Sequence, residues 1–375
     1  FFGLFLALSK LSLFSFRNHD KKEIFFSKGI TVIWGENGSG KTSLLEAIYI
    51  LSLGKSFKTH KQKSIIKTGE QSFIIKGDFL LNETKSNVAI QVNLKNQQTI
   101  KINGKTIKKR KEIIGKNNVV VLSPEDQTIT KGGPKERRSF FDRLFSIISV
   151  DYLNTLQEYT RVLKQRNALL SFTNKNQIKE ENFSPWEEKL SVSALKLWKI
   201  RKKCFSNYID HLKETTNKYQ EGLTLDVLYK EKTKTKEEHL KKLKETREKD
   251  VLLGTTSVGP HRDRIEILWK NKNIRDYGSQ GEHKISLVLL KLAEMSLIKN
   301  KTGFHPTLLL DDVFAKLDLN RSKKLVSYIN SVESKFKEPI QTIITTTDII
   351  NVEQSGLMFN NKEIKTHKLE LSWNT

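Results

Sequence analysis

The fold is decided by one stretch, Gly35-Glu36-Asn37-Gly38-Ser39-Gly40-Lys41-Thr42, which matches the pattern G-x-x-x-x-G-K-[ST] of a phosphate-binding loop. Glycines let such a loop wrap around phosphates with its N–H groups pointing inward. Residues 30–34, ITVIW, form an apolar run typical of a buried strand, and 42–53 carries leucine and isoleucine at helical spacing. The order strand, loop, helix predicts a nucleotide-binding α/β sheet rather than a plain glycine-rich turn.

Residues in and beyond the loop indicate which ligand it takes. Lys41 is placed to reach the β- and γ-phosphates, and the hydroxyl of Thr42 to ligate Mg²⁺. The apolar run 308–310 ends in Asp311 and Asp312, and α/β sheets bind ligands at the carboxyl ends of their strands. An acidic turn at a strand end is common by itself. Beside a phosphate loop, however, Asp311 is expected to hold Mg²⁺ and Asp312 to orient or deprotonate an attacking water. ATP and Mg²⁺ are therefore the predicted cofactors.

A second anion-binding segment is predicted at Gly278-Ser279-Gln280-Gly281-Glu282, directly before a helix that starts near His283. The N-terminus of a helix attracts anions, and serine is a common N-cap. A plain helix cap is the alternative reading. Because the segment lies between a phosphate loop and Asp311 in the chain, we interpret Ser279 as a further catalytic contact to the nucleotide.

Composition limits the class of protein. The chain has 375 residues, 37% of them hydrophobic, and Lys+Arg 66 against Asp+Glu 42 gives a formal charge of +24. This excess predicts a polyanionic partner such as nucleic acid, and a general bias toward lysine is the alternative explanation of part of it. A single Cys excludes a disulfide framework or a cysteine-based metal site and suits a reducing cytoplasm.

No run approaches the roughly 20 apolar residues of a membrane-spanning helix, so no membrane association is expected. The apolar start, residues 1–8, has neither a basic region nor a small-residue cleavage site. We interpret it as an upstream extension or the edge of a fragment, followed by a first strand at about 9–16.

The chain is predicted to contain two domains. Alternating apolar residues between 73 and 107 predict an antiparallel β lobe, in which Asn103-Gly104 marks a hairpin turn. Helical periodicity dominates 139–250 and predicts two antiparallel helices folded back as an arm, or else an ordinary helical subdomain. The sheet domain is then discontinuous, formed by 9–138 and 251–375, with the arm inserted at 139–250.

Together these motifs resemble those of ABC-type ATPases. In that family a signature loop of one subunit covers the ATP of another, and Ser279-Gln280-Gly281-Glu282 is similar to this loop, with Glu where Gln is usual. The segment 314–318 is similar to the dimer-contacting D-loop. Residues 345–348 lie where a switch histidine is usual, so Thr347 or Asp348 would take its role. The resemblance implies an ABC-type ATPase head, an α/β fold with an antiparallel lobe, interrupted by a helical arm.

More narrowly, the chain resembles the RecF family of bacterial DNA-repair ATPases over nearly its whole length. The resemblance rests on five blocks: 16–18 (FRN), 53–59 (LGKSFKT), 123–126 (SPED), 131–138 (KGGPKERR) and 258–263 (VGPHRD). It implies ATP-dependent binding of single-stranded or gapped DNA, gap repair, loading of RecA together with RecO and RecR, and support of the SOS response. It also implies a nucleotide contact by Arg17, a weak DNA-dependent ATPase activity and an ATP-dependent homodimer.

Some basic residues are predicted to contact DNA because they lie on loops near the phosphate site or on the β lobe: Lys55, Lys58, Lys105, Lys108 and Lys109. For each lysine the alternative is an ordinary solvated charge. The alternative for the whole chain is an ATPase subunit of a transporter or of a chromosome-structuring complex. A transporter subunit gives no reason for the charge or the arm, and a chromosome-structuring protein needs much longer helical legs.

Overall fold

The computed structural model describes residues 6–59, 61–81, 84–172, 180–231, 235–315, 318–336, 339–357 and 363–370. The chain forms two compact units. The first contains Phe1–Gln127, Thr215–Glu221 and Lys284–Thr375, and the second contains Thr128–Glu214 and Gly222–His283. The chain therefore leaves the first unit and returns to it.

A parallel sheet forms the centre of the first unit. Its strand order is β14-β3-β13-β12-β8, and every neighbouring pair is parallel. The strands are β3 (Ile30–Gly35), β8 (Val119–Leu122), β12 (Thr307–Asp311), β13 (Thr342–Thr346) and β14 (Ile364–Leu369). All residues of β8, β12 and β13 are buried, which explains the continuous apolar runs of β8 and β12.

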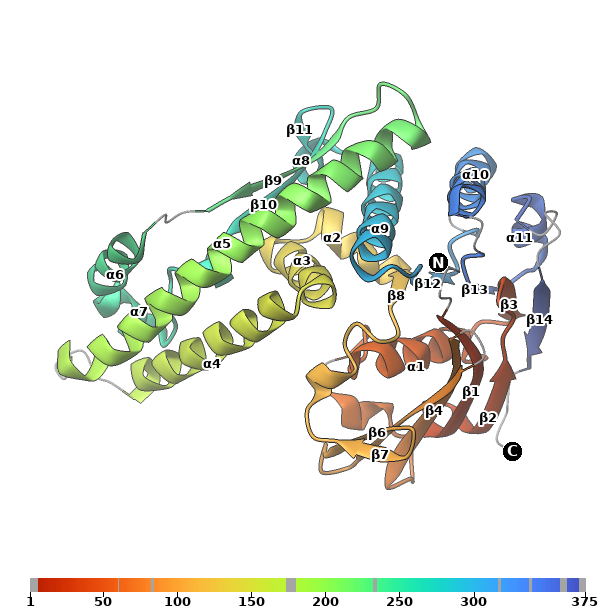
Figure 1. The fold of residues 1–375 in the computed structure, drawn as a ribbon, viewed down its shortest axis with the longest axis horizontal. Helices are drawn as coiled ribbons and strands as arrows, with labels where there is room; N and C mark the ends of the chain where they lie inside the picture. Colours follow the sequence, from red (N-terminus) through yellow and green to blue (C-terminus); the bar gives the residue numbers. More distant parts are fainter. Residues whose placement is uncertain are drawn as a thin grey trace. The chain divides into compact units, whose positions relative to one another are not determined.

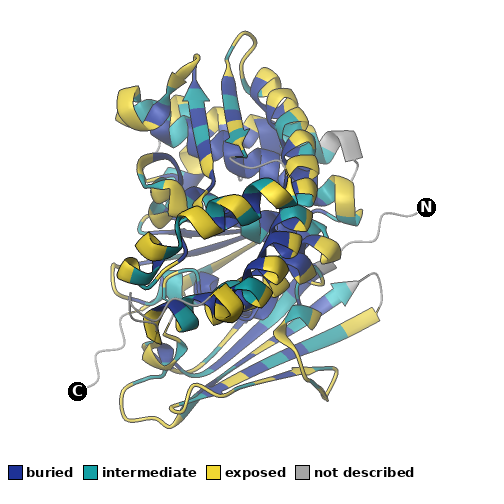
Figure 2. Cartoon of the chain, turned by 90° about the vertical axis from the view of Figure 1, so that its left-hand side faces the viewer, coloured by how far each residue is buried: buried dark blue, intermediate teal, exposed yellow. Residues whose placement is uncertain are grey.

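An antiparallel sheet forms the lobe of the same unit, in the order β2-β1-β4-β5-β6-β7. Its strands are β1 (Leu6–Phe16), β2 (His19–Phe25), β4 (Ser72–Leu81), β5 (Thr84–Asn93), β6 (Gln98–Ile102) and β7 (Lys105–Ile107). The strands of this sheet carry both buried and exposed residues, and buried positions recur at every second residue from Val88 to Val92 in β5 (Figure 2). Asn103 and Gly104 both have positive φ and join β6 to β7, so the predicted hairpin is confirmed.

Helix α1 (Lys41–Leu53) lies between the two sheets, because it contacts β3, β12 and β13 of the parallel sheet and β1, β4 and β5 of the lobe. It is buried on nearly all sides, as its apolar sequence requires. The first unit also contains most of α9 (Gln280–Thr302), the long helix α10 (Leu319–Phe336) and the short helix α11 (Ile350–Gln354).

The second unit is largely helical. Figure 1 shows α4 (Val150–Phe172) beside α5 (Glu180–Tyr219), running in the opposite direction, as predicted for a folded-back arm. The other helices are α2 (Thr128–Lys131), α3 (Pro134–Ile148), α6 (Lys236–Glu245), α7 (Arg247–Leu253) and α8 (Ile274–Tyr277). A buried ion pair joins the two long helices, with Arg166 3.0 Å from Glu187.

Two features of the second unit differ from the sequence analysis. The unit contains a small antiparallel sheet, β11 (Lys272–Asn273), β10 (Arg264–Trp269) and β9 (Leu225–Lys230), and β9 lies within 139–250, where helical periodicity dominates the sequence and no strand is predicted. The compact units also divide at 128 and 283, whereas the predicted domain bounds are 139 and 250. The strand pair β9–β10 gives the physical reason, because it ties 264–269 to the helical unit.

No helix among the described residues is both long and apolar enough to cross a membrane.

Candidate nucleotide site

The phosphate loop, 35–42, connects β3 to α1 at the carboxyl end of the parallel sheet. Gly38 and Gly40 have φ of 88° and 89°, which side chains of L-residues rarely adopt. Lys41 folds back over the loop, and its Nζ donates 2.7 Å hydrogen bonds to the carbonyl oxygens of Gly35 and Glu36. Burial lowers the pKa of Lys41, while the charges of Asp312 and Asp311 oppose this shift.

Asp311 ends β12 directly beside the loop. Its Oδ1 accepts hydrogen bonds from the hydroxyls of Thr42, at 2.9 Å, and Thr345, at 2.6 Å. Burial raises the pKa of Asp311, and both hydroxyls act in the opposite direction. Thr42, Asp311 and Thr345 lie close together because β3, β13 and β12 are neighbouring strands that end at the same edge of the sheet. The sequence motifs predict that Thr42 and Asp311 lie close together, but they do not predict the contact with Thr345.

The oxygen atoms of Thr42 and Asp311 fit a magnesium ion. Mg²⁺ prefers hard oxygen ligands and usually takes only one or two carboxylates besides phosphate and water. Asp312 follows at the strand end with φ of 54°, and its N–H donates to the carbonyl oxygen of Thr345 at 2.9 Å. This left-handed backbone is sparsely populated by non-glycine residues and concentrates at functional sites. The described residues contain no cluster of three or more His, Cys, Asp or Glu side chains suited to a metal.

The turn between β1 and β2 packs onto the phosphate loop. Asn18 Nδ2 donates to the carbonyl oxygen of Gly38 at 3.3 Å, and His19 Nε2 lies 3.3 Å from that of Gly40. A Cβ on Gly40 would lie 2.5 Å from His19 Nε2, so only glycine fits. Burial lowers the pKa of His19. Asn18 and His19 therefore support the loop, a role that the motif of the loop alone does not reveal.

Arg17 lies in the same turn, with a left-handed φ of 56°. Its Nε and one terminal nitrogen donate to the two carboxylate oxygens of Glu46 on α1, at 2.8 and 2.7 Å. The side chain of Glu46 is completely buried. Arg17, for which the sequence predicts a nucleotide contact, is therefore paired with Glu46 of α1 in this structure.

The predicted signature segment forms the start of α9. The Ser279 N–H donates to Glu282 Oε2 at 2.8 Å, and the Ser279 hydroxyl accepts from the Glu282 N–H at 3.3 Å. This reciprocal pair is a capping box. The hydrogen bond from the Ser279 backbone lowers the pKa of Glu282. Glutamate and glutamine can both take this position in a capping box. Ser279 belongs to the second unit and Lys41 to the first.

The other predicted segments are only partly described. Residues 316–317 of the predicted D-loop lie outside the described residues. In the predicted switch, the Thr346 hydroxyl donates to the carbonyl oxygen of Asp348 at 2.8 Å, and the Asp348 carboxylate accepts from the Ile350 N–H at 2.9 Å. A small pocket beside Asp311 is lined by Pro124 and Gln127.

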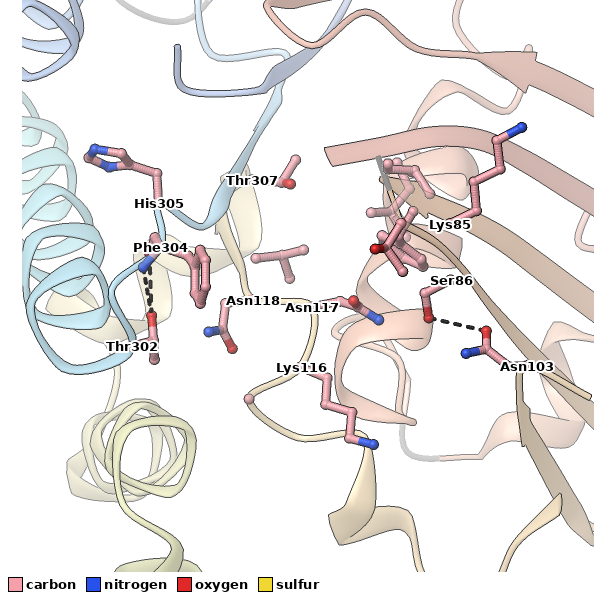
Figure 3. A pocket seen from close by; sticks show the side chains of 16 residues that line it. Lys85, Ser86, Asn103, Lys116, Asn117, Asn118, Thr302, Phe304, His305 and Thr307 are labelled. Carbon is pink, nitrogen blue, oxygen red and sulfur yellow. Dashed lines mark hydrogen bonds between the residues drawn. The ribbon is translucent and has the colours of Figure 1, made fainter. Parts of the chain in front are cut away.

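The predicted DNA-contact residues lie at several places in the first unit. Lys55 is half-buried, and the other four are exposed: Lys58, Lys105, Lys108 and Lys109. Lys58 follows α1, near enough to Asp311 for its charge to act on the pKa of that carboxyl. A hollow of about 450 Å³ near the N-terminal ends of β8 and β12 contains none of the predicted site residues (Figure 3). It is separate from the phosphate loop, which lies at the carboxyl edge.

This arrangement defines a class of protein. A parallel sheet with a phosphate loop, a flanking antiparallel lobe and a helical insertion before the signature helix form an ABC-type ATPase head. The head of an Smc protein bound to the C-terminal winged-helix domain of ScpA has the same fold, with a TM-score of 0.53 at 20% identity over 93% of this chain and 91% of that one.

Closer relatives give the family. The family described as RecF/RecN/SMC N terminal domain matches residues 7–367. The DNA replication and repair protein RecF of Alkaliphilus oremlandii is 33% identical over 352 residues, 91% of this chain and 93% of that protein. RecF of Bacillus cereus is 34% identical over 380 residues, 96% of each chain. The chain belongs to the RecF family.

A solved structure agrees with this family. The recombination mediator protein RecF-ATP in the RecFOR pathway matches with a TM-score of 0.82 at 30% identity, covering 92% of each chain. The form described as RecF-ATPrS matches with a TM-score of 0.83 at 29% identity, covering 92% of this chain and 94% of that one. The transporter and chromosome-structuring alternatives are not favoured.

Proposed function

We propose that this chain is an ATP-dependent DNA-binding protein of DNA replication and recombination repair. One observation carries the proposal: Lys41, Thr42 and Asp311 converge at the carboxyl edge of the parallel sheet, with Thr42 2.9 Å from Asp311. The relatives that match over nearly the full chain are named for DNA replication and repair, and the related solved structures contain ATP or ATPrS.

Each residue of the site has a distinct proposed task. The backbone N–H groups of residues 35–42 bind phosphate, and Lys41 exchanges its two carbonyl partners for phosphate oxygens. Thr42 and Asp311 hold Mg²⁺, which neutralises phosphate charge when bound. Asp312 orients or deprotonates the attacking water. Arg17 keeps its pair with Glu46 and exchanges the 3.5 Å hydrogen bond from its other terminal nitrogen to the Ser64 carbonyl oxygen for a contact with the nucleotide.

Closure of the site requires a second copy of the chain. A triphosphate is stabilised by positive dipole ends on both sides, and one phosphate loop supplies only one of them. Ser279 at the start of α9 supplies the second from the partner subunit, so ATP favours a homodimer. Hydrolysis reopens the dimer. We expect slow turnover, because Asp312 is one carbon shorter than the Glu common in fast ABC ATPases.

The closed dimer is proposed to bind single-stranded or gapped DNA through the five predicted lysines and to act with RecO and RecR in loading RecA. The formal charge of +24 supports a polyanionic partner. The name RecFOR pathway, which the related structures carry, supports the two protein partners.

The test measures DNA binding and oligomeric state with and without MgATP for the wild type, Lys41→Arg and Ser279→Arg. We expect ATP to promote dimers and DNA binding in the wild type. Lys41→Arg should retain the fold and lose hydrolysis, and Ser279→Arg should bind ATP as a monomer. A chain that stays monomeric with MgATP at all concentrations, or whose DNA affinity ignores ATP, would contradict the proposal.

A further inference from the structure

Glu46 is an unusual residue for its position. It lies within α1, the helix that both sheets cover, and its side chain has no exposed area. A buried carboxylate is costly unless it is paired and hydrogen-bonded. Arg17 provides the pairing charge through two bonds of 2.8 and 2.7 Å in fork geometry.

Glu46 also holds a second segment. The hydroxyl of Ser56 donates to Glu46 Oε1. The same hydroxyl oxygen accepts from the N–H groups of Lys58, at 2.9 Å, and Thr59, at 3.0 Å. Ser56 is buried. We call residues 54–59 the Ser56 loop. Its first residue, Gly54, is anchored separately, because its carbonyl oxygen accepts from Gln98 Nε2 at 3.0 Å.

The two segments serve different parts of the proposed mechanism. Arg17 precedes Asn18 and His19, which touch the carbonyl oxygens of Gly38 and Gly40 in the phosphate loop. The Ser56 loop carries Lys55 and Lys58, two of the proposed DNA contacts. The carboxylate of Glu46 thus connects the turn that supports the phosphate loop to the Ser56 loop. Lys58 in the Ser56 loop also lies close enough to Asp311 for its charge to lower the pKa of that carboxyl.

We propose that Glu46 is a positioning residue that fixes Arg17 and the Ser56 loop to the same point of α1, so that nucleotide binding and DNA binding are coupled through it. Arg17 is the partner of Glu46 on the nucleotide side, and Ser56 is its partner on the DNA side. This inference rests on the proposed function, because it takes the phosphate loop as the ATP site and Lys58 as a DNA contact.

The experiment removes the hydrogen bond between Ser56 and Glu46 and leaves the pair of Arg17 with Glu46 in place. Ser56→Ala removes the hydroxyl that links Glu46 to the backbone of Lys58 and Thr59. Ser64→Ala is the matched control, because the Ser64 hydroxyl is exposed and donates to the carbonyl oxygen of Lys61, at 2.7 Å, within a short 3-10 helix. Each full-length variant is titrated with a fluorescent ATP analogue and Mg²⁺, and with a labelled single-stranded oligonucleotide at several salt concentrations.

For Ser56→Ala we expect ATP affinity close to that of the wild type. Its DNA affinity in MgATP should fall about fivefold, the scale of a lost hydrogen bond. The slope of log affinity against log salt should fall by about 0.7 on this single strand, because Lys58 no longer contacts a phosphate. Amide hydrogen exchange at Lys58 and Thr59 should accelerate. A general loss of structure would not reduce the salt slope while sparing ATP affinity.

A second variant keeps the proposal testable if Ser56→Ala folds poorly. Glu46→Gln cannot accept the Arg17 fork with two oxygens, so both ATP and DNA affinity should fall. The coupling is overturned if Ser56→Ala matches Ser64→Ala in DNA affinity and salt slope, or if it loses ATP affinity while Glu46 still holds Arg17. A wild type that binds neither ATP nor DNA would contradict the proposed function instead.

Discussion

At the scale of single residues, the phosphate site depends on hydroxyl groups that favour the ionised form of Asp311. Asp311 is buried, and burial raises its pKa, whereas the hydrogen bonds from Thr345 and Thr42 lower it. A carboxyl group must lose its proton to hold Mg²⁺. The protonation of Asp311 therefore links the Thr345 hydroxyl to magnesium-dependent nucleotide binding.

Replacing Thr345 by Val should make nucleotide binding more sensitive to acid. Without the hydroxyl, the pKa of Asp311 rises further, so the proton is retained at higher pH. We expect the MgATP affinity of Thr345→Val to begin to fall at a higher pH than that of the wild type when the solution is acidified. In the pH range where only the variant has regained this proton, its affinity should be about tenfold weaker, the scale of a charge-assisted hydrogen bond. Titration with a fluorescent ATP analogue measures this, and Thr345→Ser, which keeps the hydroxyl, should behave as the wild type does.

The same residues show what a sequence reveals about a site. Lys41, Thr42 and Asp311 could be predicted to meet, because the loop motif and the strand-end acid each point to the same sheet edge. Thr345 and Glu46 could not be assigned their contacts in that way. Their contacts depend on which strands are neighbours and on how a turn packs against α1, and no spacing along the chain encodes either.

At the scale of elements, the start of α9 is stabilised by the reciprocal bonds of Ser279 and Glu282. Glu282→Ala should reduce the free energy of unfolding by roughly 1 kcal/mol, the usual value of a cap. The pKa of Glu282 is lowered in the folded chain. Its contribution is therefore present above the unfolded pKa of about 4.3 and is lost as the pH falls through the lower folded value.

Urea unfolding at pH 7 and at pH 3.5 measures both effects. Glu282→Gln should keep most of the cap at pH 7, because its side-chain oxygen can accept from the Ser279 N–H, and this cap should not depend on pH. If Glu282→Ala and the wild type are equally stable at pH 7, the capping box does not stabilise α9.

Element prediction succeeded where the local sequence carries a clear signal, either a turn dipeptide or a long periodicity, and failed where it carries neither. The hairpin at Asn103-Gly104 and the long arm helices follow from local sequence. Strand β9 was missed because it is a six-residue strand within a highly charged, mostly helical region. It is defined by its partner β10, more than 30 residues later in the chain, and long-range pairing of this kind is not visible in local periodicity.

At the scale of the whole molecule, the charge of +24 decides how any DNA contact should be tested. Such an excess attracts polyanions to many parts of the surface, so a loss of affinity alone does not identify a binding site. The slope of log affinity against log salt counts phosphate contacts more directly, at about 0.7 per contact on single strands. A variant must therefore be compared with another of equal net charge.

Charge reversal at Lys108 and Lys109 provides this comparison. Both lysines are exposed in the first unit, and the double variant Lys108→Glu/Lys109→Glu should reduce the salt slope by about 1.4 if each contacts one phosphate. The control, Lys196→Glu/Lys241→Glu, makes the same change of charge at exposed positions of the second unit. It should weaken binding slightly and leave the slope nearly unchanged, because long-range attraction is screened within about 10 Å at 0.1 M salt. Equal slopes for the two double variants would show that Lys108 and Lys109 act only through net charge.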